Sequence, residues 1–380
     1  MTQVALSLLL LIGAGLFARS LYNAKNIDAG FRTDHLISFA IQPSLNGYSQ
    51  ERMRGLFERL QESISRLPGI RAVSMAEVPL LAGDNEAGSL IVEGYHPKED
   101  EDMTSFENYV GPGYFATMGI PILAGRDFAK SDGAGAPKVV IVNQTLAKYF
   151  FGDENPLGRR IRFRRDEVGK EIVGVVKDGK SSDLKEKPRR FVYGSYSQMP
   201  MNRLTFYART AQSPSSAIQM LRDEVRREDA NLPIFDVKTM ERQIDESLFL
   251  DRIVAALSAA FGALATLLAT VGLYGVMAYM VVRRTREIGI RMALGADRTE
   301  VLRLVMREVV LLAVAGIGIA VLGALALGRL VESQLMGVSG HDPWVFAAAT
   351  GALAFVALSA GFFPAMRAAR VDPLSALRHE

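Results

Sequence analysis

Four long apolar runs divide this chain, and each of them is free of Asp, Glu, Lys, Arg and His. They cover residues 2–18, about 253–282, about 309–328 and about 343–366. Because ~20 apolar residues cross the hydrocarbon core of a bilayer, the pattern predicts four transmembrane helices, the first within residues 1–19. The first run has neither the basic start nor the small-residue exit of a secretory signal peptide, so we interpret it as a span.

Arginine is distributed unevenly around these runs. The loop between the second and third runs carries Arg283, Arg284, Arg286, Arg291, Arg298, Arg303 and Arg307. The tail after the fourth run carries Arg367, Arg370 and Arg378. Since basic residues in short loops favour the cytoplasmic side, both segments are predicted to be cytoplasmic, and residues of about 20–250 to lie outside. Arg19 and Lys25 give a weaker, opposite signal after the first run. No basic residue precedes that run, so we expect upstream sequence that is missing or belongs to another part of a longer polypeptide.

The segment from 20 to 238 has the pattern of an α+β domain. Alternation of apolar residues and helical spacing predict strands over 37–41, 72–78 and 204–209 and helices over 53–67 and from 213 onward. Ser49 is the expected N-cap of the first of these helices. The elements form two strand–helix units that flank an insertion of roughly 100 residues. A charged amphipathic helix over 239–252 is predicted to extend the second span as a stalk, so residues 239–380 form the last domain.

Composition excludes several chemistries. The chain has no cysteine, and its four histidines are isolated from one another, which argues against a metal centre. The formal net charge is only +3, so no nucleic-acid partner is indicated. The apolar runs lack ionisable residues, which mark ion and proton paths in secondary transporters and pumps. Transport through these helices alone is therefore not expected.

Small residues recur at intervals of four in two of the runs. They form one ridge of Ser258, Gly262, Thr266 and Thr270, and another of Gly316, Ala320, Ala324 and Gly328. Such ridges let helix backbones approach closely. Tight bundling within the chain is the simpler interpretation, and a sliding interface between two copies is the alternative.

Residues 174–181 satisfy the P-loop pattern G-x-x-x-x-G-K-[ST]. A functional P-loop needs a helix directly after the motif, so that helix N–H groups cradle the phosphates. Here the chain continues with a polar segment that Pro188 interrupts, and its predicted location is outside the cell. A surface turn is the better interpretation, and an enzymatic function would rest on this motif alone.

Residues 283–296 are a short charged segment between the second and third runs. About three helical turns are predicted from residue 283 to 294, ending at Gly295, and Asp297 with Glu300 is expected to cap the next helix. Residues 284–296 are similar to the cytosolic coupling motif of MacB/FtsX-type ABC transporter permeases, R-x-R-E-I-G-I-R-x-A-L-G-A. Residues 364–378 resemble the closing pattern of the same family, P-A-x-x-A-x-x-x-x-P-x-x-A-L-R.

The insertion carries short motifs that resemble the periplasmic core domain of MacB-like permeases in their order and spacing. They are G-Y-F at 113–115, M-G-I-P at 118–121, G-R-D-F at 125–128, V-V-I-V-N at 139–143, N-P-L-G at 155–158 and I-V-G-V-V at 172–176. Each motif alone is explained by turns and strands, so none is assigned a ligand. The resemblance implies a membrane protein with four transmembrane helices and a large two-lobed α+β periplasmic domain inserted between the first and second helices.

The resemblance also implies a function in the bacterial inner membrane. The chain is expected to be a permease subunit or half, without enzymatic activity or cofactor of its own, that couples ATP hydrolysis by an ABC ATPase partner to periplasmic movement for export or extrusion. The implied coupling residues are Arg286, Glu287, Ile288, Gly289, Ile290, Arg291, Met292, Leu294 and Gly295. Further implied partners are a second permease copy or half, a periplasmic adaptor and membrane lipid. The family usually has a cytoplasmic helix before the first span, and its lack here favours a half-permease.

Two alternatives remain at this point. One is a membrane-anchored extracytoplasmic sensor, although the predicted cytoplasmic tail of about 14 residues is short for a signalling output. The other is a regulator of cell-wall hydrolases of the FtsX kind. The sequence does not separate export, lipoprotein release and hydrolase control.

Overall fold

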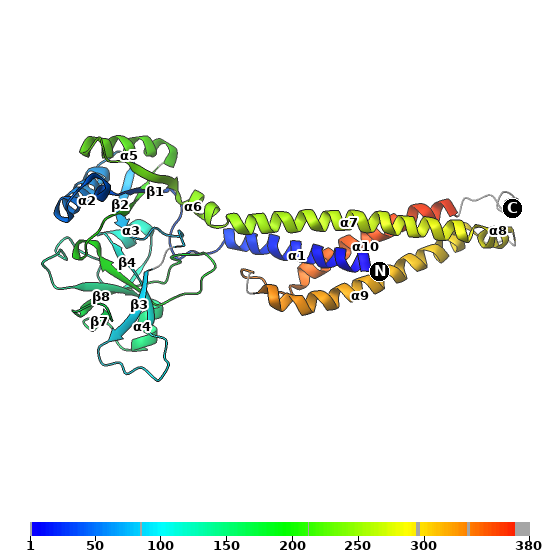
Figure 1. Cartoon of the computed structure of the whole chain (residues 1–380), viewed down its shortest axis with the longest axis horizontal. Helices are drawn as coiled ribbons and strands as arrows, with labels where there is room; N and C mark the ends of the chain where they lie inside the picture. Colours follow the sequence, from blue (N-terminus) through cyan, green and yellow to red (C-terminus); the bar gives the residue numbers. More distant parts are fainter. Residues whose placement is uncertain (1, 84–85, 212, 294–296, 333–334, 369–380) are drawn as a thin grey trace. The chain divides into compact units, whose positions relative to one another are not determined.

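The computed structural model describes residues 2–83, 86–211, 213–293, 297–332 and 335–368. It consists of two compact units. The membrane unit comprises Met1–Asn26 and Leu248–Glu380, and the extracytoplasmic unit comprises Ile27–Ser247 (Figure 1). Both boundaries between the units lie further toward the C-terminus than the sequence predicted, after residue 26 instead of 19 and after residue 247 instead of 238.

The membrane unit is helical. Its elements are α1 (Thr2–Lys25), α7 (Phe249–Arg283), α8 (Thr285–Ala293), α9 (Arg298–Glu332) and α10 (Pro343–Ala368). Within the described ranges, α1, α7, α9 and α10 are long and apolar enough to cross a membrane, which confirms the four predicted spans. Each helix continues beyond the apolar run that predicted it, because the flanking charged residues are themselves good helix formers.

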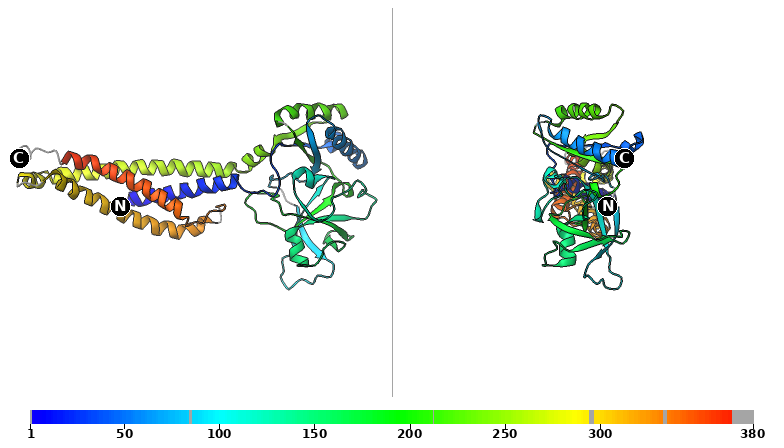
Figure 2. Two further views of the ribbon diagram at one scale, coloured as in Figure 1. Left: turned by 180° about the vertical axis from the view of Figure 1, so that it is seen from behind. Right: turned by 90° about the vertical axis from the view of Figure 1, so that its left-hand side faces the viewer.

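The other three spans pack around α1, which lies along α7 and also contacts α9 and α10 (Figure 2). Leu8 and Ile12 of α1 are buried against Ala320 and Ala324 of α9. The Ser7 hydroxyl of α1 donates a hydrogen bond of 2.7 Å to the carbonyl of Ala265 on α7. Small residues on the partner helices bring these backbones close enough for such a bond.

The loop between α9 and α10 fastens the C-terminal end of α1. Arg19 forms an ion pair of 2.7 Å with Asp342, and the Ser20 hydroxyl accepts a hydrogen bond from the Met336 amide at 2.8 Å. Asp342 also caps α10 by accepting from the Trp344 amide at 3.0 Å. Arg19, one of the two basic residues that opposed the predicted orientation, is therefore paired with a carboxylate at its own end of the bundle.

In its described residues, the extracytoplasmic unit is built on 11 strands. They are β1 (Leu36–Ile41), β2 (Ile70–Ala76), β3 (Glu86–Val92), β4 (Thr104–Val110), β5 (Ile122–Gly125), β6 (Val139–Asn143), β7 (Arg160–Phe163), β8 (Lys170–Val176), β9 (Phe191–Ser195), β10 (Leu204–Thr210) and β11 (Ile234–Thr239). The helices are α2 (Gln50–Ser65), α3 (Tyr114–Met118), α4 (Gln144–Phe151), α5 (Pro214–Glu228) and α6 (Met240–Ser247), with short 3-10 turns η1 (Pro43–Asn46) and η2 (Tyr196–Gln198).

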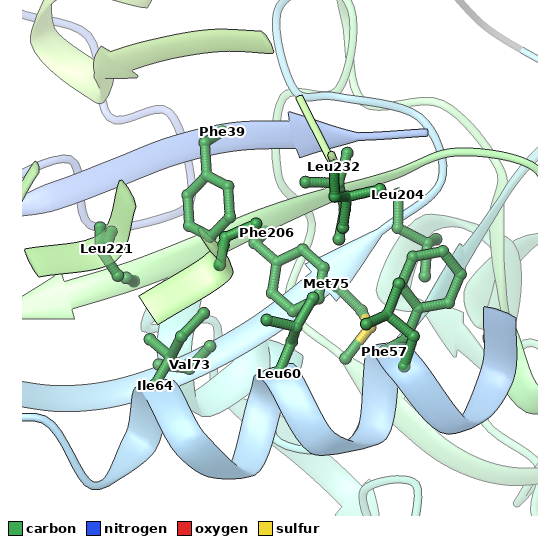
Figure 3. Packing of buried hydrophobic residues seen from close by; sticks show 14 of the residues in the cluster. Phe39, Phe57, Leu60, Ile64, Val73, Met75, Leu204, Phe206, Leu221 and Leu232 are labelled. Atoms are coloured by element: carbon green, nitrogen blue, oxygen red, sulfur yellow. The ribbon is translucent and has the colours of Figure 1, made fainter. Parts of the chain in front are cut away.

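The first lobe has the strand order β11-β1-β10-β2, with α2 and α5 on one face. One βαβ unit is β1-α2-β2 and the other is β10-α5-β11, and their strands alternate in the sheet. These are the two strand–helix units that the sequence predicted. The α2 helix begins after Ser49, whose hydroxyl accepts from the Arg52 amide as expected. Phe57, Leu60 and Ile64 of α2 point toward Phe39 and Phe206 of the sheet (Figure 3).

The second lobe is the insertion. Its strands β4, β3, β7, β8, β6 and β9 follow one another, and β9 returns to pair with β4, so that the six strands close into a ring. Strand β5 adds to β8 outside this ring. The core of the lobe contains Val140, Val142, Phe163 and Ile172, and Leu146 of α4 packs against them. One residue pair, Ala76 with Val110, links the two lobes through β2 and β4. The two-lobed α+β architecture is thus confirmed.

The predicted stalk over 239–252 is two helices. The α6 helix ends at Ser247, Leu248 has φ −92° and ψ 10°, and α7 begins at Phe249. The Leu248 side chain is almost fully buried at this break. The two helices therefore do not share one continuous face. The Gln243 side chain holds α6 by donating to the carbonyls of Leu80 and Leu81 at 3.2 and 3.0 Å.

Candidate functional site

The coupling segment expected between the second and third spans is a helical elbow. The α7 helix ends at Arg283, Arg284 has φ −102° and ψ 7°, and α8 begins at Thr285. The Arg284 amide still bonds to the Met280 carbonyl, and the Thr285 hydroxyl donates to the Val281 carbonyl at 2.9 Å. Asp297 starts α9 by accepting from the Arg298 amide at 2.7 Å. Helix α8 is therefore joined to α7 with a single non-helical residue between them.

A small apolar core holds the elbow closed. Ile288 of α8 is 3% exposed and Val301 of α9 is 4% exposed, and the two side chains pack together. Val281 and Met292 pack against them and are partly buried. Because α8 has only nine residues, it is too short to be stable alone, so this contact with α9 is what stabilises it.

The opposite face of α8 is open. Glu287, Ile290 and Arg291 are exposed, and Glu287 forms an ion pair of 2.6 Å with Arg291 one turn later. A second ion pair, at 2.5 Å, joins Arg284 to Glu308 of α9. Exposed pairs contribute little to stability, but together with Ile288 they fix the direction in which α8 presents its charged face.

Seven of the nine predicted coupling residues belong to α8, and the structure describes the surroundings of five of them. Ile288 and Met292 lie on the side that faces α9, whereas Glu287, Ile290 and Arg291 lie on the open side. Arg286 and Gly289 belong to α8, and their side chains are outside the described part of the structure. Leu294 and Gly295 lie outside the described residues, as does the tail motif from residue 369 onward. The Arg284–Glu308 pair was not predicted, since only the antiparallel path of α7 and α9 brings these residues together.

The small-residue ridge of α7 faces the bundle in part. Gly262 is buried, and a Cβ there would lie 3.4 Å from Leu11 and 3.5 Å from the Leu10 carbonyl of α1. Ser258, Thr266 and Thr270 are half-buried. The hydroxyl of Thr266 donates to the Gly262 carbonyl at 2.7 Å and that of Thr270 to the Thr266 carbonyl at the same distance. Gly262 therefore lies in the contact between α7 and α1, at distances that a Cβ would meet as ordinary van der Waals contacts.

The ridge of α9 is buried along its whole length. Gly316, Ala320, Ala324 and Gly328 are all buried. Ala320 and Ala324 pack against the core around α1, and a Cβ on Gly328 would lie 2.7 Å from the Gly340 carbonyl. In this chain, the α9 ridge serves packing within the membrane unit.

The P-loop-like residues belong to a structural turn. After β8 ends at Val176, no helix follows within the described residues up to β9. The Lys180 ammonium donates to the Glu186 carbonyl. Asp178 caps α4 by accepting from the Thr145 amide at 2.9 Å and the Thr145 hydroxyl at 2.7 Å. Gly30 lies against this turn so closely that a Cβ would be 2.4 Å from the Asp178 carbonyl.

We therefore expect no saturable ATP binding by the purified chain at millimolar nucleotide, in calorimetric titration of the wild type or of Lys180→Ala. The physical reason is that the lysine is engaged by the turn, that no helix follows the motif within the described residues, and that the neighbouring N-terminus of α4 is already occupied by the Asp178 carboxylate. Lys187→Ala, an exposed lysine of the same loop, is the matched control. ATP binding that Lys180→Ala abolishes and Lys187→Ala leaves intact would restore the P-loop interpretation.

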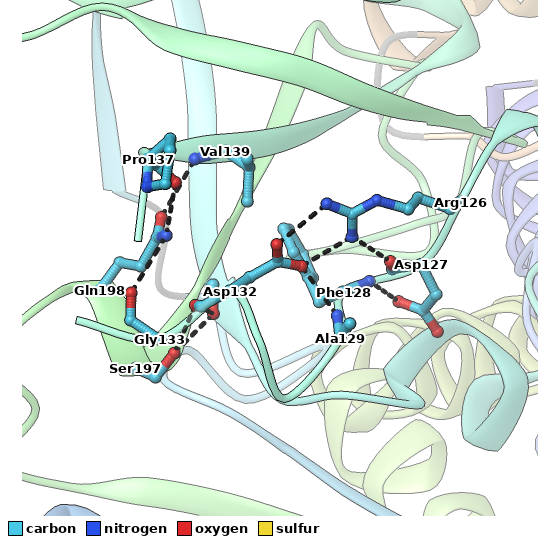
Figure 4. Close-up of polar contacts among 11 residues, drawn as sticks. Arg126, Asp127, Phe128, Ala129, Asp132, Gly133, Pro137, Val139, Ser197 and Gln198 are labelled. Atoms are coloured by element: carbon cyan, nitrogen blue, oxygen red, sulfur yellow. Dashed lines mark hydrogen bonds and ion pairs between the residues drawn. The ribbon is translucent and has the colours of Figure 1, made fainter. Parts of the chain in front are cut away.

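The G-R-D-F motif fastens a loop of the second lobe (Figure 4). The Arg126 guanidinium donates to both Asp132 oxygens, at 2.7 and 2.9 Å, and thereby holds the pKa of that carboxyl below its usual range. Burial raises the pKa of Asp127, which accepts from the Phe128 amide at 2.7 Å. The hydroxyl of Ser197 donates to the Asp132 carbonyl at 2.9 Å. The polar side chains of the motif are therefore engaged in contacts that stabilise the fold.

Comparisons with known proteins identify the family. Residues 4–231 match the model of the MacB-like periplasmic core domain, and residues 259–373 match the model of the FtsX-like permease C-terminal domain. The chain is 30% identical over 301 residues to the uncharacterized ABC transporter permease YknZ of Bacillus subtilis, covering 75% of this chain and 72% of that protein.

Two further relatives are fused proteins that are much longer. The pyoverdine export ATP-binding/permease protein PvdT of Pseudomonas syringae pv. tomato is 28% identical, over 68% of this chain and 40% of that protein. The macrolide export ATP-binding/permease protein MacB of Neisseria meningitidis is 26% identical, over 73% of this chain and 44% of that protein. The chain thus spans less than half the length of these two relatives.

Among solved structures, the periplasmic region of MacB from Actinobacillus actinomycetemcomitans matches at 18% identity, over 58% of this chain and 94% of that structure, with a TM-score of 0.38. The family assignment rests on the sequence matches, which cover both units. The chain therefore belongs to the MacB/FtsX-type ABC transporter permeases, as an inner-membrane protein whose core domain lies outside the cytoplasm.

Proposed function

We propose that this permease couples ATP hydrolysis by a separate ABC ATPase to movement of its extracytoplasmic unit, for export or extrusion of a substrate. The observation that carries the proposal is the elbow at α8. It combines a buried apolar contact to α9 with an open, charged face, and it is joined to α7 by one residue. A force applied to the open face of α8 would therefore act on two transmembrane helices together.

Helix α7 supplies the path for such movement. It has 35 residues, which at ~1.5 Å per residue is ~50 Å, well beyond the ~30 Å of the hydrocarbon core. Two of the relatives are named as exporters in which the ATP-binding and permease parts share one chain. We infer that the ATP-binding part here is a partner protein, and that the permease itself is not an enzyme and acts as a dimer with a second permease copy or half.

The open face of α8 is the proposed docking surface for the ATPase, with Glu287 and Arg291 as polar contacts and Ile290 as an apolar one. Glu287→Arg is expected to weaken capture of a co-expressed ABC ATPase by at least about tenfold and to abolish its stimulation, since like charges opposed in an interface cost several kcal/mol. The measurements are pull-down from membranes and ATPase activity of the reconstituted pair.

Two further variants separate docking from helix stability. The double variant Glu287→Arg/Arg291→Glu retains an ion pair one turn apart but reverses the surface, so it should also fail to dock. Glu332→Arg makes the same charge change at the opposite end of α9 and should have no effect. Normal capture and stimulation by both α8 variants would mean that the elbow is only a connector between spans.

A further inference from the structure

The sheet of the first lobe has a second face, away from α2 and α5, and this face is hollow. Strand alternation places Phe39 and Phe206 on the helix-covered face, and Ser38, Ala40 and Thr205 on the other. Ala40 lies directly opposite Thr205 in the β1–β10 pairing. Because these side chains are small, the sheet leaves a cavity of about 600 Å³.

The walls of this cavity come from within the extracytoplasmic unit. The loop after β2 contributes Glu77, Val78, Pro79 and Leu80, and α6 contributes Met240. The loop is held over the sheet by the Gln243 side chain and by the Leu80 amide, which donates to the Tyr207 hydroxyl at 2.9 Å. A cavity of this size is in the range that holds a drug-sized molecule.

The cavity wall includes polar groups that have no partner among the described residues, and Thr205 and Glu77 are the two that matter here. Thr205 is 4% exposed, and its hydroxyl makes no hydrogen bond. The half-buried Glu77 carboxylate has neither a hydrogen bond nor an ion pair to any described residue. Folded proteins normally satisfy buried polar groups, so the unpartnered Thr205 hydroxyl and the Glu77 carboxylate favour a ligand with polar atoms at these two places.

The other charged groups of the cavity are already paired. Arg203 forms an ion pair of 3.1 Å with Asp236, and Lys238 one of 2.8 Å with Glu246. Glu86 lies 3.6 Å from Arg165. Arg165 attracts the Glu77 carboxylate only at longer range. Glu77 is therefore the cavity carboxylate that lacks a direct ion pair among the described residues, and a cation would complement it.

We propose that this cavity binds an amphipathic organic amine, with the ammonium at the Glu77 carboxylate, a hydrogen bond to the Thr205 hydroxyl, and the apolar body against Val78, Leu80 and Met240. A half-buried carboxylate without an ion pair gains from a cation that reaches it. The mixed wall suits a molecule with one charged end and an apolar body. The site is independent of coupling to an ATPase and is testable without one.

The test is fluorescence titration of the full chain in lipid nanodiscs with dansylcadaverine, whose dansyl group reports an apolar environment and whose primary amine is charged. Burial and the nearby Glu86 raise the pKa of Glu77 to about 7, so the titration is done at pH 8, where the carboxylate is ionised. Empty nanodiscs supply the background from partition into lipid. Wild-type chain is expected to show saturable binding above this background.

Variants locate the probe. Glu77→Gln is expected to weaken binding by about 10- to 100-fold, the loss of a charge-assisted hydrogen bond, and Thr205→Val by about 2- to 10-fold. Glu93→Gln, an exposed carboxylate outside the cavity, is the control and should bind normally. N-acetyl-dansylcadaverine has the same body without the charge and should bind as weakly as dansylcadaverine binds to Glu77→Gln.

Several results would overturn the proposal. They are absence of binding above empty nanodiscs, equal binding by wild type and Glu77→Gln, and equal binding of the charged and acetylated probes. Glu77→Gln removes an uncompensated charge and should fold at least as well as wild type, which a thermal melt checks. Thr205→Val tests the cavity a second time through a neutral substitution.

Discussion

Replacing Phe206 with alanine is expected to destabilise the first lobe of the extracytoplasmic unit by about 3–5 kcal/mol. Phe206 is fully buried, stacks on Phe39 at a centroid distance of 5.3 Å, and contacts Phe57 of α2 at 6.3 Å. The substitution removes the ring through which the sheet packs on α2 and leaves a cavity that the surrounding strands cannot close.

Hydrogen exchange of α2 and α5 in the full chain measures this effect. The sole tryptophan, Trp344, lies in the membrane unit, so its fluorescence does not report on the lobe. The expected loss of stability corresponds to about a 10²- to 10⁴-fold faster exchange of amides that open with the lobe. Phe235→Ala is the matched control, because Phe235 of β11 is 37% exposed and should cost far less. Equal exchange in the two variants would contradict the assigned core.

Ile288→Asp is expected to open the elbow and abolish stimulation of a partner ATPase. Ile288 is 3% exposed against Val301, so a carboxylate there would be buried without a partner, which folded structures avoid by separating the elements. Amides of α8 should lose protection from exchange, since the nine-residue helix is not stable alone. Insertion of the four spans should be normal, because the substitution lies outside them.

The conservative substitution Ile288→Val tests whether the elbow needs only an apolar side chain at this position. Ile288→Val keeps the apolar contact, should cost about 0.5–1.5 kcal/mol, and should retain most of the ATPase stimulation. If Ile288→Asp retained protection of α8, the elbow would not depend on this contact. If Ile288→Asp lost protection of α8 yet stimulated the ATPase fully, the contact would stabilise the elbow as described, but the elbow would not transmit force.

The sequence determined the membrane architecture, because a bilayer imposes one strong requirement. Any segment that crosses it must bury about 20 apolar residues and satisfy its own backbone hydrogen bonds, so uncharged runs alone located α1, α7, α9 and α10. Local rules also placed several elements of the extracytoplasmic unit. Alternation located β1 and β10, and Ser49 with the spacing of Leu60 and Ile64 located α2.

What the sequence did not determine is which faces of these elements meet. Ile288 and Ile290 are two residues apart on one short helix and both belong to the implied coupling residues, yet one is buried against Val301 and the other is exposed. The break at Leu248 was likewise invisible to periodicity, since charged residues on both sides of it have helical spacing.

The tertiary structure alone decided the position of β10 between β1 and β2, and with it the cavity at Thr205 and Glu77. These two residues are separated by more than 100 positions in the chain, and nothing in their local sequence marks them as neighbours. Hydropathy and capping act over a few residues, whereas burial depends on pairings between distant strands. Only the folded sheet brings small side chains, a free carboxylate and a free hydroxyl to one hollow face.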